Sequence, residues 1–162
     1  SMEILMSISE IVEEHSLPIQ ELDDWYRKHA SDTISAQIVR AGIWLGKGDH
    51  RNAGRAFKEA ANRSEGFEVR TALNRKALIQ LAHAKAWKDA VDLIERNEEL
   101  LAAITNKFQL FLRVCNEYEG GKKDAATGLI VNYVRDSNKD LSDEISQPRE
   151  LLFRIGASQR AI

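Results

Sequence analysis

Apolar side chains recur at intervals of three and four residues along almost the whole chain. The pattern runs through three stretches: Ile4, Leu5, Ile8, Ile11 and Val12; Ile19, Leu22 and Tyr26; and Ile104, Phe108, Phe111, Leu112 and Cys115. This spacing gathers apolar side chains on one face of an α-helix, and no run of alternating β-branched residues competes with it. Each such face needs a partner helix to cover it. The sequence therefore predicts an all-α fold of about eight or nine helices with no sheet.

Nothing in the sequence indicates a membrane-spanning or exported protein. The 162 residues hold no apolar run near the roughly 20 that a membrane helix requires, and residues 1–6 lack a basic segment followed by a long apolar one. The single cysteine, Cys115, cannot form an internal disulfide, which fits a reducing compartment. A chain of this length suits one domain. We expect one all-helical domain over residues 2–162, located in the cytoplasm.

A repeat is indicated by small and aromatic residues within the segment AGIWLGKGDHRNAGRAFKEAA, namely Ala41, Trp44, Gly48, Ala53, Phe57 and Ala60. In order and spacing this segment resembles a tetratricopeptide (TPR) repeat. Two weaker units follow, since Ala90 lies 37 residues after Ala53 and Ala125 lies 35 after Ala90, near the family period of about 34. The resemblance covers residues 34–135 and implies a TPR-like solenoid of about three helical hairpins. A related helical-hairpin solenoid would give the same pattern.

Residues 2–30 are predicted to form an N-terminal helical hairpin, with Ser16 as the cap of its second helix. The outline is that of a DNA-reading helix-turn-helix. However, the second helix begins with Glu21, Asp23 and Asp24, whose charge opposes contact with phosphate. Acidic residues in the first turns of a helix stabilise its dipole, so these charges are explained without a ligand. We therefore predict a packing element rather than a DNA-binding motif.

Residues 140–162 are predicted to form a C-terminal helix. Its apolar residues are Leu151, Leu152, Phe153 and Ile155. Terminal elements of a solenoid hide the exposed end of its core. This helix therefore either caps the fold or docks on another protomer.

The resemblance also implies a partner-binding surface, because in TPR proteins the first helix of each unit lines a concave groove where peptides usually bind. Carried onto this sequence, the groove residues are Arg75, Ile79 and His83 from the second unit and Lys107, Val114 and Tyr118 from the third. This mixture of side chains suits an extended or helical peptide with an acidic end. The family's pattern for holding chaperone tails is not reproduced, because Phe111 occupies one position expected to be basic.

A basic face is predicted on the second helix of the first unit. Arg51, Arg55 and Lys58 line one side of this helix. Acidic residues such as Glu59 and Glu65 are interspersed in the same region. These charges are therefore explained equally well by a solvated surface with some ion pairs and by a binding site.

The sequence contains no recognisable catalytic or metal-binding pattern. The four histidines, His15, His29, His50 and His83, lie on different predicted elements, and no zinc, di-iron, Walker or nucleophile-elbow motif is present. Cys115 lies in an apolar stripe, which favours a buried structural thiol. We therefore expect no enzyme activity, no metal and no cofactor.

These features predict a non-enzymatic protein–protein interaction module, such as an adaptor, scaffold or small chaperone, that binds a protein or peptide partner in a helical groove. The alternative is a nucleic-acid-associated regulator that uses the N-terminal hairpin or the basic middle region. A third hypothesis is self-assembly into a homo-oligomer, because an excess of acids in residues 1–34 opposes an excess of bases in residues 35–97. We expect no membrane partner. Steep salt dependence of binding would indicate the nucleic-acid alternative.

Overall fold

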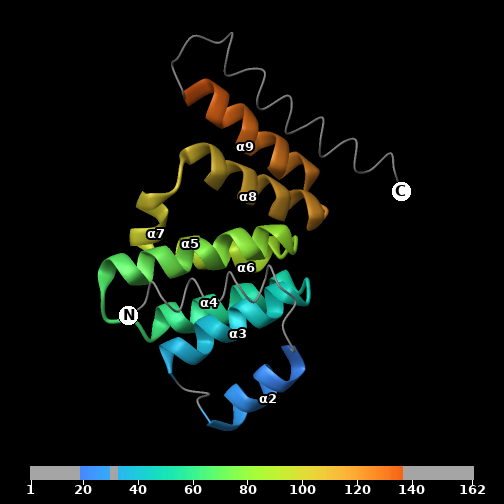
Figure 1. Ribbon diagram of the computed structural model, residues 1–162. Coiled ribbons are helices and arrows are strands. Elements are labelled where there is room, and N and C mark those ends of the chain that lie inside the picture. The colour runs from blue at the N-terminus through green and yellow to red at the C-terminus, as the bar shows by residue number, and fades with distance from the viewer. Residues whose placement is uncertain (1–18, 30–32, 137–162) are drawn as a thin grey trace. The chain divides into compact units, whose positions relative to one another are not determined.

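A computed structural model describes residues 19–29 and 33–136, and this part of the chain contains eight α-helices and no strand (Figure 1). The helices are α2 (Ile19–His29), α3 (Ile34–Gly46), α4 (His50–Asn62), α5 (Phe67–His83), α6 (Trp87–Glu95), α7 (Glu98–Ala103), α8 (Asn106–Glu119) and α9 (Lys123–Asp136). The all-α prediction is confirmed for these residues. The predicted C-terminal helix and the first helix of the N-terminal hairpin lie outside them.

The chain divides into two compact units, residues 1–103 (unit 1) and residues 104–162 (unit 2). The helices α2 to α7 belong to unit 1, and α8 and α9 belong to unit 2. A single domain over residues 2–162 stays a prediction.

In unit 1, α4 lies between α3 and α5 and packs against both helices (Figure 1). Side-chain caps fix where two of these helices begin. The Thr33 hydroxyl oxygen accepts a hydrogen bond from the Ala36 N–H at 3.1 Å, and the Asp49 carboxylate accepts one from the Asn52 N–H at 3.0 Å. Such caps satisfy backbone donors that have no partner inside the helix. The α3–α4 hairpin is therefore specified locally on both sides of its turn.

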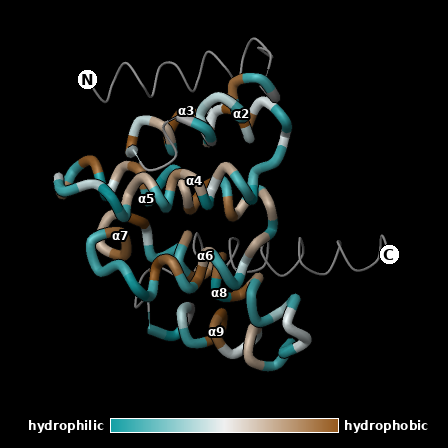
Figure 2. The backbone as a smooth tube through the Cα atoms, turned by 90° about the horizontal axis from the view of Figure 1, so that it is seen from below, coloured by the Kyte–Doolittle hydropathy of each residue, from teal (hydrophilic) through white to brown (hydrophobic). Residues whose placement is uncertain are grey.

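The core of unit 1 includes large aliphatic and aromatic side chains at most 2% exposed: Ile38, Val39, Ile43, Phe57, Leu73, Leu78, Leu81, Leu93, Ile94 and Leu100. Figure 2 shows hydrophobic and hydrophilic residues interspersed along the helices, as expected when one face of each is covered. Helix α2 adds Leu22 and Tyr26, which pack against Val39 and Ile43. The second helix of the predicted N-terminal hairpin is therefore a packing element.

Unit 2 has its own small core between α8 and α9. Leu110 and Val114 from α8 pack with Ala126 and Ile130 from α9. The partly buried residues Tyr118, Leu129 and Tyr133 lie against this cluster.

Three helical hairpins, α3–α4, α5–α6 and α8–α9, share one turn geometry. The turn residue has a positive φ in each: 72° at Gly48, 53° at Lys85 and 80° at Gly121. In all three turns the N–H of this residue donates to the carbonyl of the residue three positions earlier. The N–H of the following residue donates to the carbonyl of the residue five positions before it. This is a common way for a helix to end, and glycine is the usual residue at its left-handed position. Lys85 therefore adopts the conformation of the glycine it replaces.

The same register places buried residues at matching positions of the three hairpins. The position seven residues before the turn residue holds Ala41, Leu78 and Val114. The position five residues after it holds Ala53, Ala90 and Ala126, and the position nine residues after it holds Phe57, Ile94 and Ile130. The predicted register of the third unit is therefore wrong by one residue, since Ala125 is exposed and Ala126 is buried. One residue rotates a helix by about 100°, which changes the face on which every side chain lies.

Lys85→Gly is expected to raise the free energy of unfolding of unit 1 by about 1 kcal/mol, because glycine adopts a positive φ without the steric cost that a Cβ carries. Urea unfolding followed by tryptophan fluorescence measures this change. The reverse substitution at the equivalent turn, Gly48→Lys, is the matched control and is expected to lower stability by a similar amount. Unchanged stability in both variants would contradict the steric argument.

Candidate functional site

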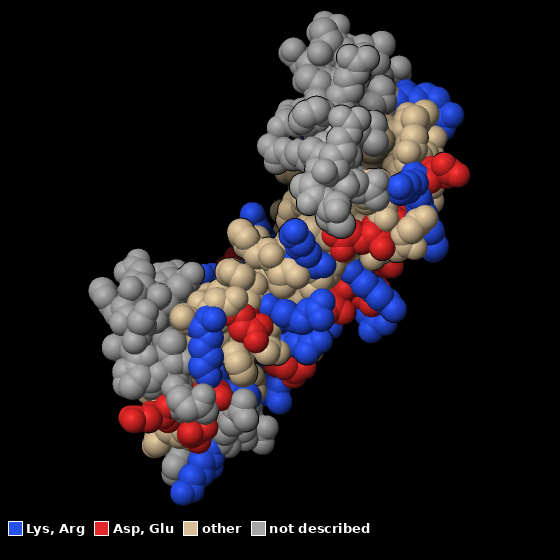
Figure 3. All heavy atoms as spheres, turned by 90° about the vertical axis from the view of Figure 1, so that its right-hand side faces the viewer, with Lys and Arg blue, Asp and Glu red and all other residues tan. Residues whose placement is uncertain are grey.

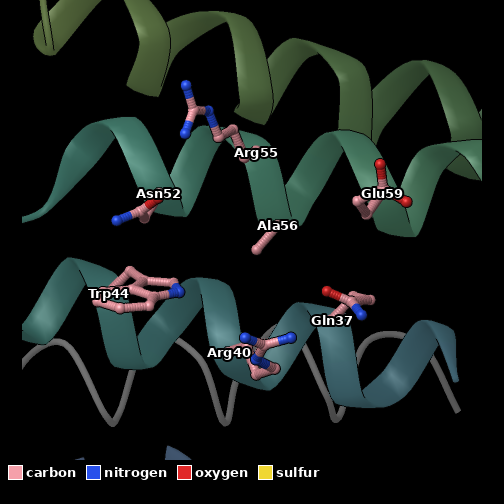
Figure 4. Close-up of a pocket in the computed structure, with 7 residues that line it drawn as sticks. All are labelled: Gln37, Arg40, Trp44, Asn52, Arg55, Ala56 and Glu59. Carbon is pink, nitrogen blue, oxygen red and sulfur yellow. The ribbon is translucent and has the colours of Figure 1, made fainter. Parts of the chain in front are cut away.

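Unit 1 contains a hollow of about 410 Å³ between α3 and α4 (Figure 4). Its lining residues are Gln37, Arg40 and Trp44 from α3 and Asn52, Arg55, Ala56 and Glu59 from α4. The two helices run in opposite directions, so Trp44 and Asn52 lie at one end of the hollow and Gln37 and Glu59 at the other (Figure 4). The volume falls within the range of about 300 to 1,000 Å³ that is typical of ligand pockets.

Arg40 is held in the hollow by a buried carboxylate. Its Nε donates to Asp23 Oδ1 of α2 at 3.3 Å, and the Asp23 side chain is only 1% exposed. A buried carboxylate requires a charged or hydrogen-bonded partner, so this pair fixes the guanidinium in place. The pair engages only Nε, and the two terminal Nη groups of Arg40 make no hydrogen bond or ion pair with another described residue. Arg40 therefore retains donors for a ligand.

Arg55 is the second guanidinium of the hollow and is exposed. The pKa of the Asp49 carboxyl is lowered chiefly by the hydrogen bond from the Asn52 backbone, with smaller contributions from Arg55 and Arg51. Within the described part of the chain, Arg55 makes no direct ion pair, and its electrostatic link is this attraction to Asp49. Its guanidinium fork therefore remains available.

The carboxylate of the hollow, Glu59, is already paired. Arg63, which follows the last residue of α4, donates from Nη1 to Glu59 Oε2 at 2.7 Å. Arg63 does not line the hollow. In Figure 4, Arg40 lies between Trp44 and Gln37 along α3, and the Arg55 side chain points away from α3. Glu59 lies at the end of the hollow opposite to Trp44.

Trp44 supplies the aromatic surface of the hollow and is partly buried. The Lys47 ammonium lies 4.9 Å from the centroid of its ring, within cation–π range. An indole ring offers a broad apolar face at low entropic cost to a partner side chain. The hollow thus combines one apolar platform with two guanidinium groups.

The groove residues predicted on α5 are all exposed. Arg75, Ile79 and His83 lie at solvent-facing positions, and 46% of Ile79 is accessible. The His83 ring stacks on His50 of α4 with centroids 5.3 Å apart, and His50 Nδ1 lies 2.8 Å from Gln80 Oε1. This face of α5 is therefore partly ordered by its neighbours and is open to a partner.

The groove residues predicted on α8 differ from one another in their exposure. Val114 is 0% exposed within the core of unit 2, so its assignment to a binding surface is wrong. Val114 lies seven residues before the turn residue, the position that the buried residues Ala41 and Leu78 occupy in the other two hairpins. Tyr118 packs partly against the same core, with Lys123 Nζ 5.7 Å from its ring centroid. Lys107 is exposed.

Of the predicted basic face, Arg51 and Arg55 are exposed and Lys58 is half-buried. Only Arg55 also lines the hollow. Figure 3 shows basic and acidic side chains interspersed on the face that it displays, rather than a field of one sign. Arg40 and Trp44 were not predicted as residues of a binding site. They lie four residues apart in α3, which places both on one face of this helix.

The remaining candidate groups are the possible metal ligands and the single cysteine. No group of three or more His, Cys, Asp or Glu side chains in these ranges is arranged to hold a metal ion. Burial raises the pKa of the Cys115 thiol to about 11, with Glu119 adding to the effect. The thiol is therefore protonated at neutral pH and unreactive, as expected for a structural cysteine.

No described helix is long and apolar enough to cross a membrane. Comparison with known proteins found no matching protein-family model, no matching curated protein and no matching solved structure.

Proposed function

We propose that this chain is a non-enzymatic protein-interaction module, an adaptor or small chaperone, whose hollow between α3 and α4 receives a segment of a partner protein. The observation that carries the proposal is the hollow itself, in which the Trp44 indole and the guanidinium groups of Arg40 and Arg55 border about 410 Å³. Trp and Arg are enriched among the side chains that dominate binding energy at protein interfaces. The hollow is large enough to receive an anchoring side chain with its neighbouring backbone.

We also propose that the helices form a TPR-like arrangement. Three hairpins with a common turn and matching buried positions agree with a helical repeat. Paired helices hold their surface side chains at fixed positions, so a partner segment would meet a preformed surface at low entropic cost. In this proposal the partner is cytoplasmic, and the exposed residues Arg75, Ile79 and His83 of α5 form a second docking surface.

Selection from a random peptide library on the immobilised full chain tests the proposal, followed by titration of the selected peptides against two variants. Ala56 lies within the hollow (Figure 4). Ala56→Leu adds bulk there without changing any charge, and we expect it to weaken binding at least about tenfold. Trp25→Ala is the matched control, because Trp25 is 53% exposed and does not line the hollow. Its effect is expected to stay within about twofold.

Each alternative outcome is informative once both variants are shown to unfold at the same temperature as the wild type. If the selected peptides bind Ala56→Leu normally, the hollow is not the binding site. If Ile79→Asp removes binding instead, the partner occupies α5 and not the hollow. If no peptide is selected and duplex DNA binds with steep salt dependence, the protein is a nucleic-acid-associated regulator and the proposal is overturned.

A further inference from the structure

Two exposed helix faces of unit 1 carry the same order of side chains at the same spacing. On each face an acid is followed four residues later by an apolar side chain, and three residues after that by a base. The residues are Glu21, Trp25 and Lys28 on α2, the α2 stripe, and Glu68, Ala72 and Arg75 on α5, the α5 stripe. This spacing places each set along one side of its helix, over a length of about 10 Å.

Both stripes are accessible to a partner. All six residues are exposed, and 53% of Trp25 is accessible. None of the four charged residues forms an ion pair with another described residue. The α5 stripe continues to Ile79, which lies four residues beyond Arg75 and is 46% exposed. Each stripe therefore offers two charges and an apolar surface that its own helix leaves unmatched.

Within one chain the two stripes do not meet. Helix α2 packs against α3 through Leu22 and Tyr26, which lie on the side of α2 opposite to its stripe. Helix α4 lies between α3 and α5 (Figure 1). The α2 stripe can therefore reach an α5 stripe only in another molecule.

We infer that the α5 stripe binds the α2 stripe of a second copy of this chain, with the two helices antiparallel. The antiparallel direction reverses one order of charges relative to the other. It places Glu21 of one copy opposite Arg75 of the other, and Lys28 opposite Glu68. Two ion pairs of opposite charge then lie at the two ends of the contact.

The apolar residues at the centre of the stripes fit the same alignment. Trp25 lies opposite Ala72, whose small side chain leaves room for the indole ring. Aromatic anchors of this kind supply much of the binding energy at protein interfaces. With the helices parallel, the same alignment would place acid opposite acid and base opposite base. The order of charges therefore selects the antiparallel direction.

This inference rests on the α5 docking surface of the proposed function and names its occupant. The two stripes are different surfaces, so each copy donates its α2 stripe to one neighbour and accepts a neighbour on its α5 stripe. The hollow between α3 and α4 takes no part in this contact. Self-association and peptide binding in the hollow are therefore measured separately.

Analytical ultracentrifugation of the full chain over a range of concentrations tests the inference. We expect the average mass of the wild type to rise with concentration. Glu21→Arg and Arg75→Glu are each expected to weaken self-association at least about tenfold, because each variant places like charges opposite one another. The double variant is expected to associate as the wild type does, and so is an equimolar mixture of the two single variants. Both restore opposite charges at this position.

Lys88→Glu is the matched control, since it reverses the charge of an exposed residue of α6 that belongs to neither stripe. Its self-association should stay within about twofold of the wild type, because exposed charges that lie far from a contact are screened by salt. Recovery in the double variant and in the mixture also shows that the single variants are folded.

The outcomes separate the inference from the proposed function. If the wild type stays monomeric, the inference is wrong, whereas selected peptides that lose affinity for Ala56→Leu still support the hollow. If Lys88→Glu weakens association as much as Arg75→Glu, the effect is general electrostatics and the inference is overturned. If neither the double variant nor the mixture recovers, Glu21 does not meet Arg75 and the antiparallel contact is wrong. If association follows the expected pattern while Ala56→Leu binds peptides normally, the inference stands and the hollow is not the binding site.

Discussion

Phe57→Ala is expected to lower the free energy of unfolding of unit 1 by about 3 to 5 kcal/mol. The ring of Phe57 is 2% exposed and lies at the repeat position that Ile94 and Ile130 occupy in the other hairpins. Helix α4 packs against both α3 and α5, so a cavity at this position would loosen two helix contacts at once. The Lys76 ammonium, 5.8 Å from the ring centroid, would also lose its contact. An alanine side chain at position 57 is too short to fill the space that the Phe57 ring occupies.

Urea unfolding followed by tryptophan fluorescence measures the loss, because all three tryptophans, Trp25, Trp44 and Trp87, lie in unit 1. Phe67→Ala is the matched control, since it makes the same substitution at a ring that is 58% exposed. Its effect is expected to stay within about 0.5 kcal/mol. Equal shifts of the unfolding midpoint for the two variants would show that Phe57 does not fill the core.

Most of the described fold was predictable because its determinants are local. Apolar residues at helical spacing predict the helices, and turn residues such as Gly48 predict where a hairpin reverses. The turn at Lys85 was harder to predict, since lysine carries no preference for a positive φ, and only the repeat register points to it. The third unit offers two adjacent glycines, Gly120 and Gly121, and the prediction that Ala125 matches Ala53 implies a turn at Gly120. Only Gly121 has the positive φ.

The candidate site was less predictable because it depends on contacts between helices. Arg55 was identified as part of a basic face, but charge alone does not show which basic residue borders a hollow. Arg40 and Trp44 become site residues only once the α3–α4 turn brings them opposite Asn52 and Arg55 (Figure 4). The burial of Val114 and Ala126 follows from a turn at Gly121, whereas the predicted register is displaced by one residue. Errors of this kind exchange a core face for a surface face.

Gly54→Leu is expected to destabilise unit 1 by about 3 kcal/mol, since Gly54 marks a close approach between α4 and α5. A Cβ at this position would lie 3.0 Å from Leu81 Cγ and 3.1 Å from the Ala77 carbonyl oxygen. The leucine side chain can rotate, but the carbonyl belongs to the backbone of α5 and moves only with the helix. A larger side chain therefore forces the two helices apart, and urea unfolding followed by tryptophan fluorescence measures the loss.

The variants Gly54→Ala and Gly128→Leu separate the steric cost from the effect of glycine on the helix itself. Replacing a helical glycine by alanine gains about 1 kcal/mol in propensity, so Gly54→Ala should lose less stability than Gly54→Leu. Gly128 lies in α9 with nothing within 4 Å of an added Cβ, so Gly128→Leu should maintain or raise the stability of unit 2. Hydrogen exchange of the backbone amides measures each unit separately. A stable Gly54→Leu variant would mean that α4 and α5 do not pack as closely as this spacing requires.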